Sequence, residues 1–180
     1  EMNEIPRGSY NEKAVSDWLV AFAKERNFEV RQDKALNVII KKPATPGYED
    51  HPAIILQGHM DMVCEKTDDS NHDFTKDPIA FIVDGDWLHA DRTTLGADNG
   101  IAVAMSLAVL DSDTIQHGPL TCIFTTSEET SMGGAKELDA TGVVGKYLLN
   151  IDTEEEGDFV VSCAGGCNVD VEFPTFRDNR

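Results

Sequence analysis

The residues best suited to catalysis in this sequence are ligands for divalent metal ions. Side chains of this kind follow three apolar runs: His59 follows the first, Glu128 and Glu129 follow the second, and Asp152 follows the third. Asp98 lies in a glycine-containing loop that leads into a further apolar segment. One imidazole and several carboxylates, with no cysteine among them, suit zinc, manganese or cobalt bound through nitrogen and oxygen.

The spacing of these residues indicates different roles. Residues two apart in an extended segment point to the same side, so Asp61 can contact the second ring nitrogen of His59 and fix its tautomer. Adjacent residues in an extended segment point to opposite sides, so one of Glu128 and Glu129 can bind metal while the other acts on water. A carboxylate held on a constrained loop, such as Asp98, can bridge two ions roughly 3.5 to 4 Å apart.

Each of these features alone also has a simpler interpretation. A histidine and an aspartate after a strand often form a surface pair, Asp98-Asn99-Gly100 is typical of a turn that caps a helix, and paired glutamates are often solvated. The placement of all of them at strand ends or in adjoining loops favours one shared site.

Helices are predicted from apolar residues at helical spacing. Ser9 and Glu12 form an S-x-x-E capping-box pattern, and the apolar positions after it predict an amphipathic helix that ends near Asn27. Two further helices are expected at residues 100–110 and 133–138.

Strands are predicted from short apolar runs. Residues 53–56 are continuously apolar, which is typical of a strand covered on both faces, and the largely apolar residues 120–124 and 147–151 have a similar character. Shorter β-rich runs occupy residues 28–31 and 38–40, and residues 81–90 predict a hairpin with Asp84-Gly85 as its turn. The alternation of strands and helices predicts an α/β fold with a mostly parallel or mixed sheet flanked by helices. Ligands of such sheets bind beyond the carboxyl ends of the strands, where the acids lie.

Six segments of the sequence resemble one enzyme family, the M20 metallopeptidases, and within it the aminoacyl-histidine dipeptidases. The resembling segments are residues 58–63, 72–78, 94–101, 127–129, 150–154 and 163–166. The resemblance implies that His59 and Asp152 bind one zinc ion, that Glu129 binds a second, and that Asp98 bridges them. It also implies that Glu128 is the general base for metal-assisted hydrolysis of a small peptide, while the aspartate two residues after the histidine orients the imidazole.

The resemblance also divides the chain into two parts. Residues 1–163 correspond to part of a catalytic domain, and residues 164–180 to the beginning of a lid domain with a half-buried strand at 168–173. In the family, the second ion takes a further histidine from a segment after the lid, and relatives commonly dimerise through the lid. We do not expect a substitute for that ligand among the remaining histidines, which are His51, His72, His89 and His117. We therefore expect the chain as given to bind the second ion weakly and to have little activity.

Two alternatives remain open at this point. Another M20 activity, such as that of a tripeptidase, a carboxypeptidase or an N-acyl amino acid deacylase, would use the same metal chemistry. A binding protein that keeps the fold without catalysis is the other alternative, but it would have no need of a base such as Glu128 beside a metal ligand.

Composition limits the partners. The net charge of -18 over 180 residues would repel the phosphates of nucleic acid and an anionic membrane surface. No apolar stretch approaches the roughly 18 residues of a membrane span, and no secretory signal is seen at the start, so we expect a cytoplasmic protein. The four scattered cysteines, expected to be reduced, lack the usual spacing of a structural zinc site.

Overall fold

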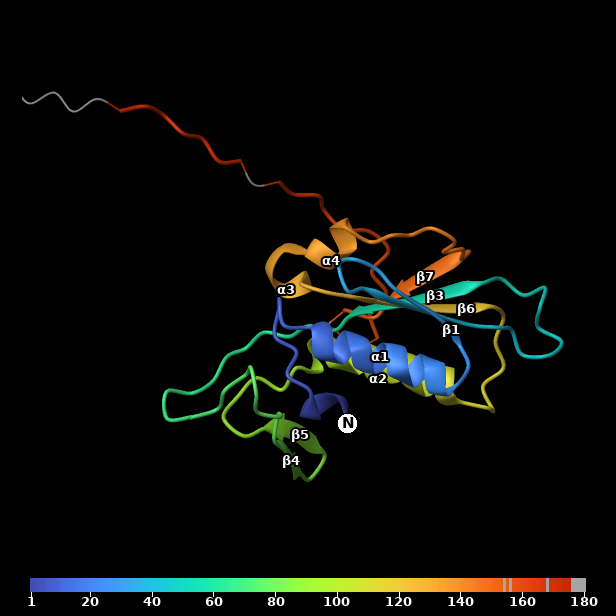
Figure 1. Ribbon diagram of the computed structural model, residues 1–180, viewed down its shortest axis with the longest axis horizontal. Coiled ribbons are helices and arrows are strands. Elements are labelled where there is room, and N and C mark those ends of the chain that lie inside the picture. Colours follow the sequence, from blue (N-terminus) through green and yellow to red (C-terminus); the bar gives the residue numbers. More distant parts are fainter. Residues whose placement is uncertain (154, 156, 168, 176–180) are drawn as a thin grey trace, which may run out of the picture.

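Figure 1 shows the computed structural model, which describes residues 1–153, 155, 157–167 and 169–175. The helices are η1 (Met2–Glu4), α1 (Lys13–Glu25), α2 (Ala97–Asp111), α3 (Glu128–Ser131) and α4 (Gly133–Lys136). The strands of the main sheet are β1 (Glu29–Gln32), β2 (Val38–Lys42), β3 (Ile54–His59), β6 (Leu120–Thr125) and β7 (Tyr147–Asn150). A separate hairpin consists of β4 (Phe81–Asp84) and β5 (Trp87–Ala90).

The main sheet is mixed and has the strand order β1-β2-β6-β3-β7. β3 runs parallel to both β6 and β7, whereas β1 and β2 add to the β6 edge in antiparallel fashion. The predicted α/β class is confirmed, and the parallel part consists of the three strands that precede the predicted ligands. In the register of β3 and β6, His59 pairs with Thr125, so the carboxyl ends of these strands coincide.

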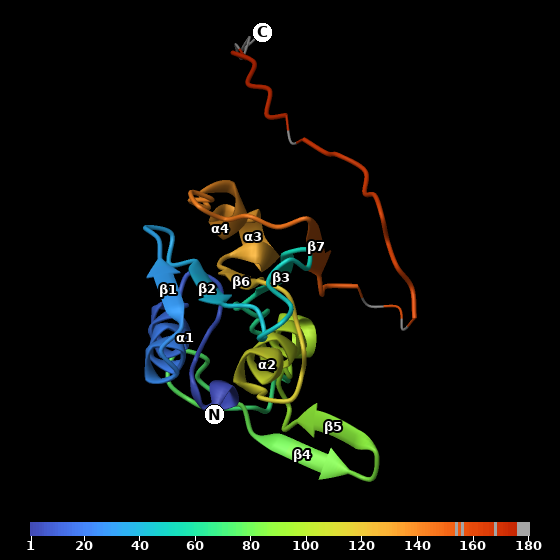
Figure 2. The same ribbon diagram turned by 90° about the vertical axis from the view of Figure 1, so that its right-hand side faces the viewer.

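Helices cover the sheet on both faces. Figure 2 shows α1 and α2 on one side of the sheet and α3 and α4 on the other. The larger apolar core lies under α1 and α2, where Leu19, Val103 and Phe124 are almost completely buried. On the opposite face, Ile39 and Ile123 pack against the segment that carries Leu138 and Val143. This two-sided burial fixes the central strands and therefore the residues at their ends.

The first helix forms as predicted, but its predicted cap does not. Val15, Leu19 and Ala23 form the buried face of α1. Glu12 occupies the N-cap position and makes no side-chain capping bond there. The side chains of Ser9 and Glu12 hydrogen-bond instead to Asp61 and Ser127, residues far away in sequence. The capping-box prediction was therefore wrong, because these polar groups have buried tertiary partners.

Strand β7 differs from its prediction in burial. Its apolar residues suggested coverage on both faces, yet Tyr147, Leu148 and Leu149 are 44–57% exposed. β7 is an edge strand of the main sheet, and within the described residues it pairs with β3 alone. Apolar sequence indicates a tendency to be buried, but it does not provide the covering element.

The hairpin β4-β5 forms with its turn one residue later than predicted. Asp84 pairs with Trp87, so the turn consists of Gly85 and Asp86. Gly85 has a φ of 59°, and the left-handed conformation at the first turn position favours glycine.

The prediction of a strand at residues 168–173 was wrong for residues 169–173, which the structure describes. Asn168 lies outside the described residues, and residues 169–173 contain no strand. Val169, Val171 and Phe173 are 63–79% exposed, because no neighbouring strand pairs with them in the described part of the chain. The division into two domains at residue 163 stays a prediction. No helix in the described ranges is long and apolar enough to cross a membrane.

Candidate metal centre

The imidazole of His59 is buried at the end of β3, and its Nδ1 atom contacts Asp61. Nδ1 lies 3.1 Å from the backbone oxygen of Asp61 and 3.2 Å from its Oδ1 atom. Both side chains are at most 1% exposed. A proton on Nδ1 is donated to these oxygens, which directs Nε2 toward the acidic side chains. The predicted contact between Asp61 and the second ring nitrogen is therefore present in the fold.

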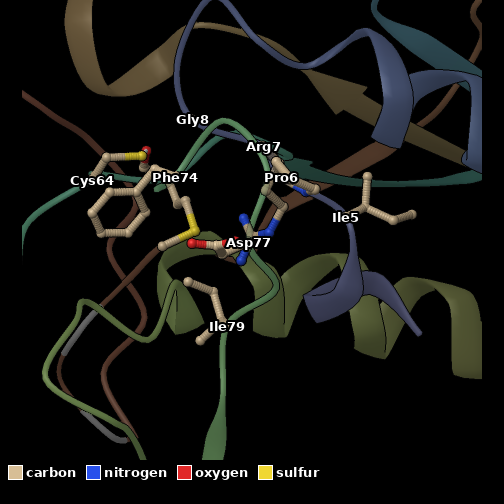
Figure 3. Close-up of a pocket in the computed structure, with 9 residues that line it drawn as sticks. Ile5, Pro6, Arg7, Gly8, Cys64, Phe74, Asp77 and Ile79 are labelled. Atoms are coloured by element: carbon tan, nitrogen blue, oxygen red, sulfur yellow. Dashed lines mark hydrogen bonds between the residues drawn. The ribbon is translucent and has the colours of Figure 1, made fainter. Parts of the chain in front are cut away.

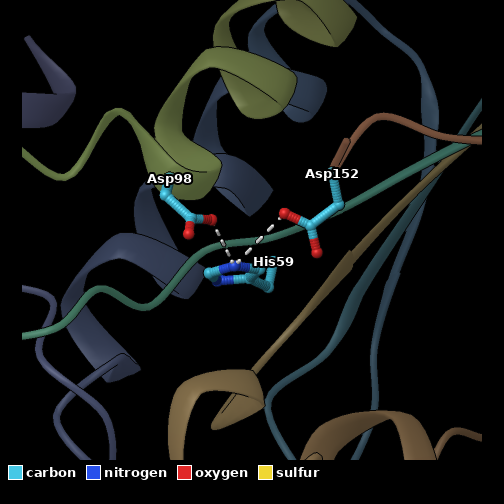
Figure 4. A group of neighbouring side chains, drawn as sticks. All are labelled: His59, Asp98 and Asp152. Carbon is cyan, nitrogen blue, oxygen red and sulfur yellow. Dashed lines mark hydrogen bonds and ion pairs between the residues drawn. The ribbon is translucent and has the colours of Figure 1, made fainter. Parts of the chain in front are cut away.

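Three carboxylates lie around Nε2 of His59. Asp98 Oδ1 is 3.1 Å away, and Asp152 Oδ1 and Glu128 Oε2 are each 3.8 Å away. One ligand atom from each of His59, Asp98 and Asp152 lies within 4.8 Å of the others. Figure 4 shows these three side chains converging from β3, the start of α2 and the segment after β7. The residues come from distant parts of the sequence, as the strand-end argument predicted.

The Asp98 loop is joined directly to the Asp152 segment. Asp98 and Asn99 have non-helical backbone angles at the start of α2, and the peptide bond between them is cis. The side-chain amide of buried Asn99 donates to the backbone oxygen of Ile151 at 2.6 Å and to Asp152 Oδ1 at 2.5 Å. Asn99 thus sets the distance between two of the acids.

Glu128 and Glu129 lie in a short helix, so the predicted extended conformation was wrong. Ser127, with a φ of 51°, turns the chain from β6 into α3. The amides of Glu128 and Glu129 point to Asp61 and donate to its Oδ1 and Oδ2 atoms at 3.1 and 3.3 Å. Glu128 Oε2 lies 3.8 Å from Nε2 of His59, but neither glutamate belongs to the three-residue cluster.

The charges around His59 change its protonation. Burial alone would lower the pKa of the imidazole, but the hydrogen bond and the charge of Asp61 outweigh it. Together with the charges of Asp152 and Glu128, they raise the pKa of His59 from 6.5 to about 9. Burial would likewise raise the pKa of Asp61, yet the hydrogen bonds from His59 and Ser9 lower it.

The pKa values of Glu128, Glu129 and Asp152 are raised, whereas that of Asp61 is lowered. Burial, and then the negative charges of neighbouring acids, raise the pKa of Glu128 and of Asp152, although the charge of His59 opposes the shift. Burial and the charge of Asp98 raise the pKa of Glu129. Within the described residues, the ion pairs of Asp98, Glu128 and Asp152 are with His59, and no lysine or arginine pairs with them. These acids therefore form a site of concentrated negative charge.

Comparison with known proteins places the chain that carries this acidic cluster in an enzyme family. The family model for peptidase family M20/M25/M40 matches residues 55–173, which include all the predicted ligands. The chain belongs to peptidase family M20/M25/M40. The resemblance stated from the sequence motifs is thereby confirmed.

The M20 relatives are considerably longer than this chain. The cytosol non-specific dipeptidase of Escherichia coli is 47% identical over 162 residues, which are 90% of this chain and 33% of the relative. The structure of aminoacylhistidine dipeptidase from Vibrio alginolyticus matches with a TM-score of 0.84 and 49% identity, over 87% of this chain and 32% of that one. A tripeptidase structure from Staphylococcus aureus matches with a TM-score of 0.68 and 25% identity, over 84% and 41%. The chain thus spans about a third of the length of the dipeptidase relatives.

The donor set of this M20 chain fits a divalent ion. Two ligand atoms bound tetrahedrally to one zinc ion lie roughly 3.4 Å apart, given bond lengths of about 2.0 to 2.2 Å. The distances from His59 Nε2 to Asp98 and Asp152, 3.1 and 3.8 Å, lie on either side of that value. Two further features suit a cation: the Nδ1 atom of His59 is fixed by Asp61, and the surrounding acids share His59 as their ion-pair partner within the described residues. The arrangement of His59, Asp98 and Asp152 therefore fits one divalent ion.

Sequence reasoning missed several residues that hold this M20 site together. They are Arg7, Ser9, Glu12 and Asn99, which hydrogen-bond to the site or to its loops. Figure 3 shows Arg7 among the residues that line a small cavity. That cavity, of about 10 Å³, holds no more than about one water molecule and is too small for a substrate. A charged residue between Pro6 and Gly8 was the available signal for Arg7.

Proposed function

We propose that the complete protein is a metal-dependent dipeptidase that hydrolyses aminoacyl-histidine peptides. The main support for this proposal is the convergence of His59, Asp98 and Asp152, with Glu128 Oε2 3.8 Å from Nε2 of the imidazole. The names of the relatives from Escherichia coli and Vibrio alginolyticus support the substrate class, since one is a non-specific dipeptidase and the other an aminoacylhistidine dipeptidase.

Two divalent ions would be held by these side chains. His59 and Asp152 would bind the first ion, Glu129 the second, and Asp98 both. Zinc suits the one-nitrogen, oxygen-rich donor set, and manganese or cobalt would also be accepted. When bound, such ions polarise a scissile carbonyl and make water more acidic. In this chain the first site has more ligands than the second, so we expect the second ion to bind weakly.

Glu128 would move the proton. Its raised pKa brings the carboxylate closer to working pH, which makes it a better acceptor of a proton from water and a better donor of that proton to the leaving amine. Its backbone amide is anchored on Asp61, which also holds His59. Asp61 thereby keeps the base and the imidazole in a fixed relation without contacting the substrate.

The substrate, the partners and the compartment belong to the complete protein. The relative named a tripeptidase favours a second candidate, in which the same centre hydrolyses tripeptides. We also propose a cytoplasmic location, which the name of the Escherichia coli relative supports, and a homodimer formed through the lid, which the family resemblance supports. A panel of dipeptides, tripeptides and N-acetyl amino acids, assayed with the full-length protein, separates these activities. Fastest turnover of an Xaa-His dipeptide is expected, and turnover of N-acetyl amino acids alone would contradict the proposal.

Calorimetric titration with Zn²⁺ tests the metal centre in this chain. We expect one tight site and one weak site, and loss of the tight site in the His59→Ala variant. His51→Ala is the matched control, because His51 is exposed and precedes β3 instead of following it. Two tight sites would contradict the expected weak second site, and tight binding that survives His59→Ala would refute the proposed ligand set.

A further inference from the structure

The segment before α1 lies under the metal centre and makes buried polar contacts that the proposed chemistry does not use. Arg7 and Glu12 are 4% and 3% exposed, which is unusual for charged residues. Ser9 lies between them in sequence and contacts Asp61. We call Arg7, Ser9 and Glu12 together the N-terminal bracket.

Arg7 connects two loops that carry predicted ligands. Its Nη1 atom donates to the backbone oxygens of Met60 and Asp61 at 3.0 and 3.1 Å, in the loop that follows His59. Its Nη2 atom donates to the backbone oxygen of Gly96 at 2.5 Å, in the loop that precedes Asp98. One guanidinium therefore fixes the separation of these two loops.

Two glycines lie so close to Arg7 that a Cβ atom at either position would displace its guanidinium. A Cβ atom placed on Gly96 would lie 2.4 Å from Nη2 of Arg7, and Gly96 has a φ of 72°. A Cβ atom on Gly100 would lie 2.9 Å from the same nitrogen. The glycines that flank Asp98 thus leave room for the guanidinium.

Glu12 holds the other side of the site. Its Oε1 atom accepts hydrogen bonds from the backbone amide of Ser127 at 2.8 Å and from the Ser127 hydroxyl at 2.9 Å. Ser127 has a left-handed backbone, an uncommon conformation for serine that is maintained by surrounding contacts. This residue turns the chain so that the amides of Glu128 and Glu129 face Asp61.

Ser9 completes the connection through Asp61. Its hydroxyl donates to Asp61 Oδ2 at 2.8 Å, and Oδ2 also accepts from the Glu129 amide. The other oxygen, Oδ1, lies near His59 Nδ1 and accepts from the Glu128 amide. The segment from Arg7 to Glu12 therefore contacts, directly or through Asp61, the loops of His59, Asp98 and Glu129.

We propose that the N-terminal bracket positions the metal ligands and the base relative to one another, so that Arg7, Ser9 and Glu12 set metal affinity without touching the ion. This inference rests on the proposed metal centre. It differs from a purely structural role, in which loss of the bracket would lower stability alone. Partners that orient ligands in this way typically change metal affinity by about 10- to 100-fold when removed.

Substitutions at Glu12 separate positioning from stability. Glu12→Ala removes the acceptor for Ser127, whereas Glu12→Gln keeps an Oε1 atom that accepts the same bonds. Leu19→Ala is the control for stability, because Leu19 is a buried member of the apolar core on α1. Co²⁺ affinity and the visible absorption of bound Co²⁺ are measured in the whole chain well below each melting temperature.

We expect Glu12→Ala to weaken Co²⁺ binding by at least about 10-fold and to change its absorption bands. Glu12→Gln should restore most of both properties, and Leu19→Ala should melt earlier while it binds Co²⁺ as the unaltered chain does. Equal affinity and spectra in Glu12→Ala and the unaltered chain would overturn the proposal. So would a loss in Leu19→Ala as large as that in Glu12→Ala.

A measurement without metal keeps the test independent of the proposed function. Amide hydrogen exchange at Ser127, Glu128 and Glu129 in the metal-free chain should accelerate in Glu12→Ala and much less in Glu12→Gln. Unchanged exchange would overturn the bracket, even if the metal centre is correct. If the unaltered chain does not bind Co²⁺ but exchange accelerates in Glu12→Ala, the metal centre is refuted. The N-terminal bracket would then order the Ser127 turn, but the proposal that it sets metal affinity would be overturned.

Discussion

The site has two parts: a floor, which is Asp61, and a mouth, which consists of Asp98, Glu128, Glu129 and Asp152. Both parts consist of carboxylates, but the two differ in the hydrogen bonds and ion pairs that the carboxylates make. In the floor, the carboxylate of Asp61 is completely buried and receives hydrogen bonds from protein groups on both oxygens. In the mouth, the side chains of Asp152, Glu128 and Asp98 are 25%, 31% and 58% exposed and share one imidazole as their ion-pair partner. A buried acid that is fully paired is a structural element, whereas several partly exposed acids with one partner are a place for a cation.

The contrast extends to the pKa values. Hydrogen bonds lower the pKa of Asp61, whereas burial and mutual repulsion raise the pKa of Glu128, Glu129 and Asp152. The surroundings of Asp61 therefore favour its ionised form, whereas the surroundings of the mouth acids disfavour ionisation. We infer that the mouth reduces the stability of the metal-free chain, while the floor maintains the geometry.

Removal of the floor acid should have the largest effect. Asp61→Ala leaves the Ser9 hydroxyl and the amides of Glu128 and Glu129 without their acceptor. It also leaves the Nδ1 atom of His59 with only the backbone oxygen of residue 61. We expect the free energy of unfolding to fall by about 3 to 5 kcal/mol, as when one partner of a buried charged pair is removed. Urea unfolding measures this loss. Asp50→Ala, at an exposed loop position, is the control, and a loss under about 1 kcal/mol in Asp61→Ala would remove the contrast between floor and mouth.

Metal should stabilise the chain through the mouth. At a free Zn²⁺ concentration about 100 times the dissociation constant, binding to the folded state alone adds about 2.7 kcal/mol. Thermal melts with Zn²⁺ and after addition of a chelator measure the difference. A melting temperature that is the same in both conditions would argue that the acids do not share an ion.

The pH dependence of metal binding should follow His59. Because the folded pKa of about 9 lies above 6.5, His59 adds stability to the metal-free chain below about pH 6.5, and this stability is lost as pH rises through about 9. An ion must displace this proton, so affinity should rise about tenfold per pH unit below pH 9. Calorimetry in buffers of different ionisation enthalpy counts the protons released. Release of no proton at neutral pH would show that the imidazole is not a ligand.

Neutralisation of one mouth acid should have the smallest effect on stability and a clear effect on function. Asp152→Asn keeps the oxygen that accepts from Asn99 and removes a repelling charge. We expect the metal-free chain to gain about 0.5 kcal/mol and to lose most of its stabilisation by Zn²⁺. Melts of the variant with and without Zn²⁺ test both points, with the exposed Asp158→Asn as control. Destabilisation of the metal-free variant would contradict the inferred repulsion.

The strand ends were predictable from sequence because apolar runs mark buried strands. His59 and Asp152 follow such runs, and the i, i+2 relation of His59 and Asp61 is a property of extended backbone. His59 and Asp152 converge because β3 and β7 are parallel neighbours. Asp98 joins them because α2 packs against β3 and its Asn99 hydrogen-bonds to Asp152. The fold class and the site location therefore needed only local pattern and topology.

Other features were not predictable for physical reasons. The S-x-x-E pattern of Ser9 and Glu12 has the same spacing whether the side chains cap a helix or bind distant partners. The four residues of α3 are too few to show a helical period, so Glu128 and Glu129 were assigned to an extended segment. The exposure of β7 and of residues 169–173 depends on which neighbours are present, and a local pattern does not encode neighbours.

The ligands themselves are tested most directly by X-ray absorption at the zinc edge of the chain loaded with one equivalent of Zn²⁺. We predict nitrogen and oxygen scatterers at about 2.0 to 2.2 Å, with the multiple scattering of one imidazole that disappears in His59→Ala. Sulfur scatterers near about 2.3 Å, or imidazole scattering that persists in His59→Ala, would contradict a metal centre formed by the imidazole and the mouth acids.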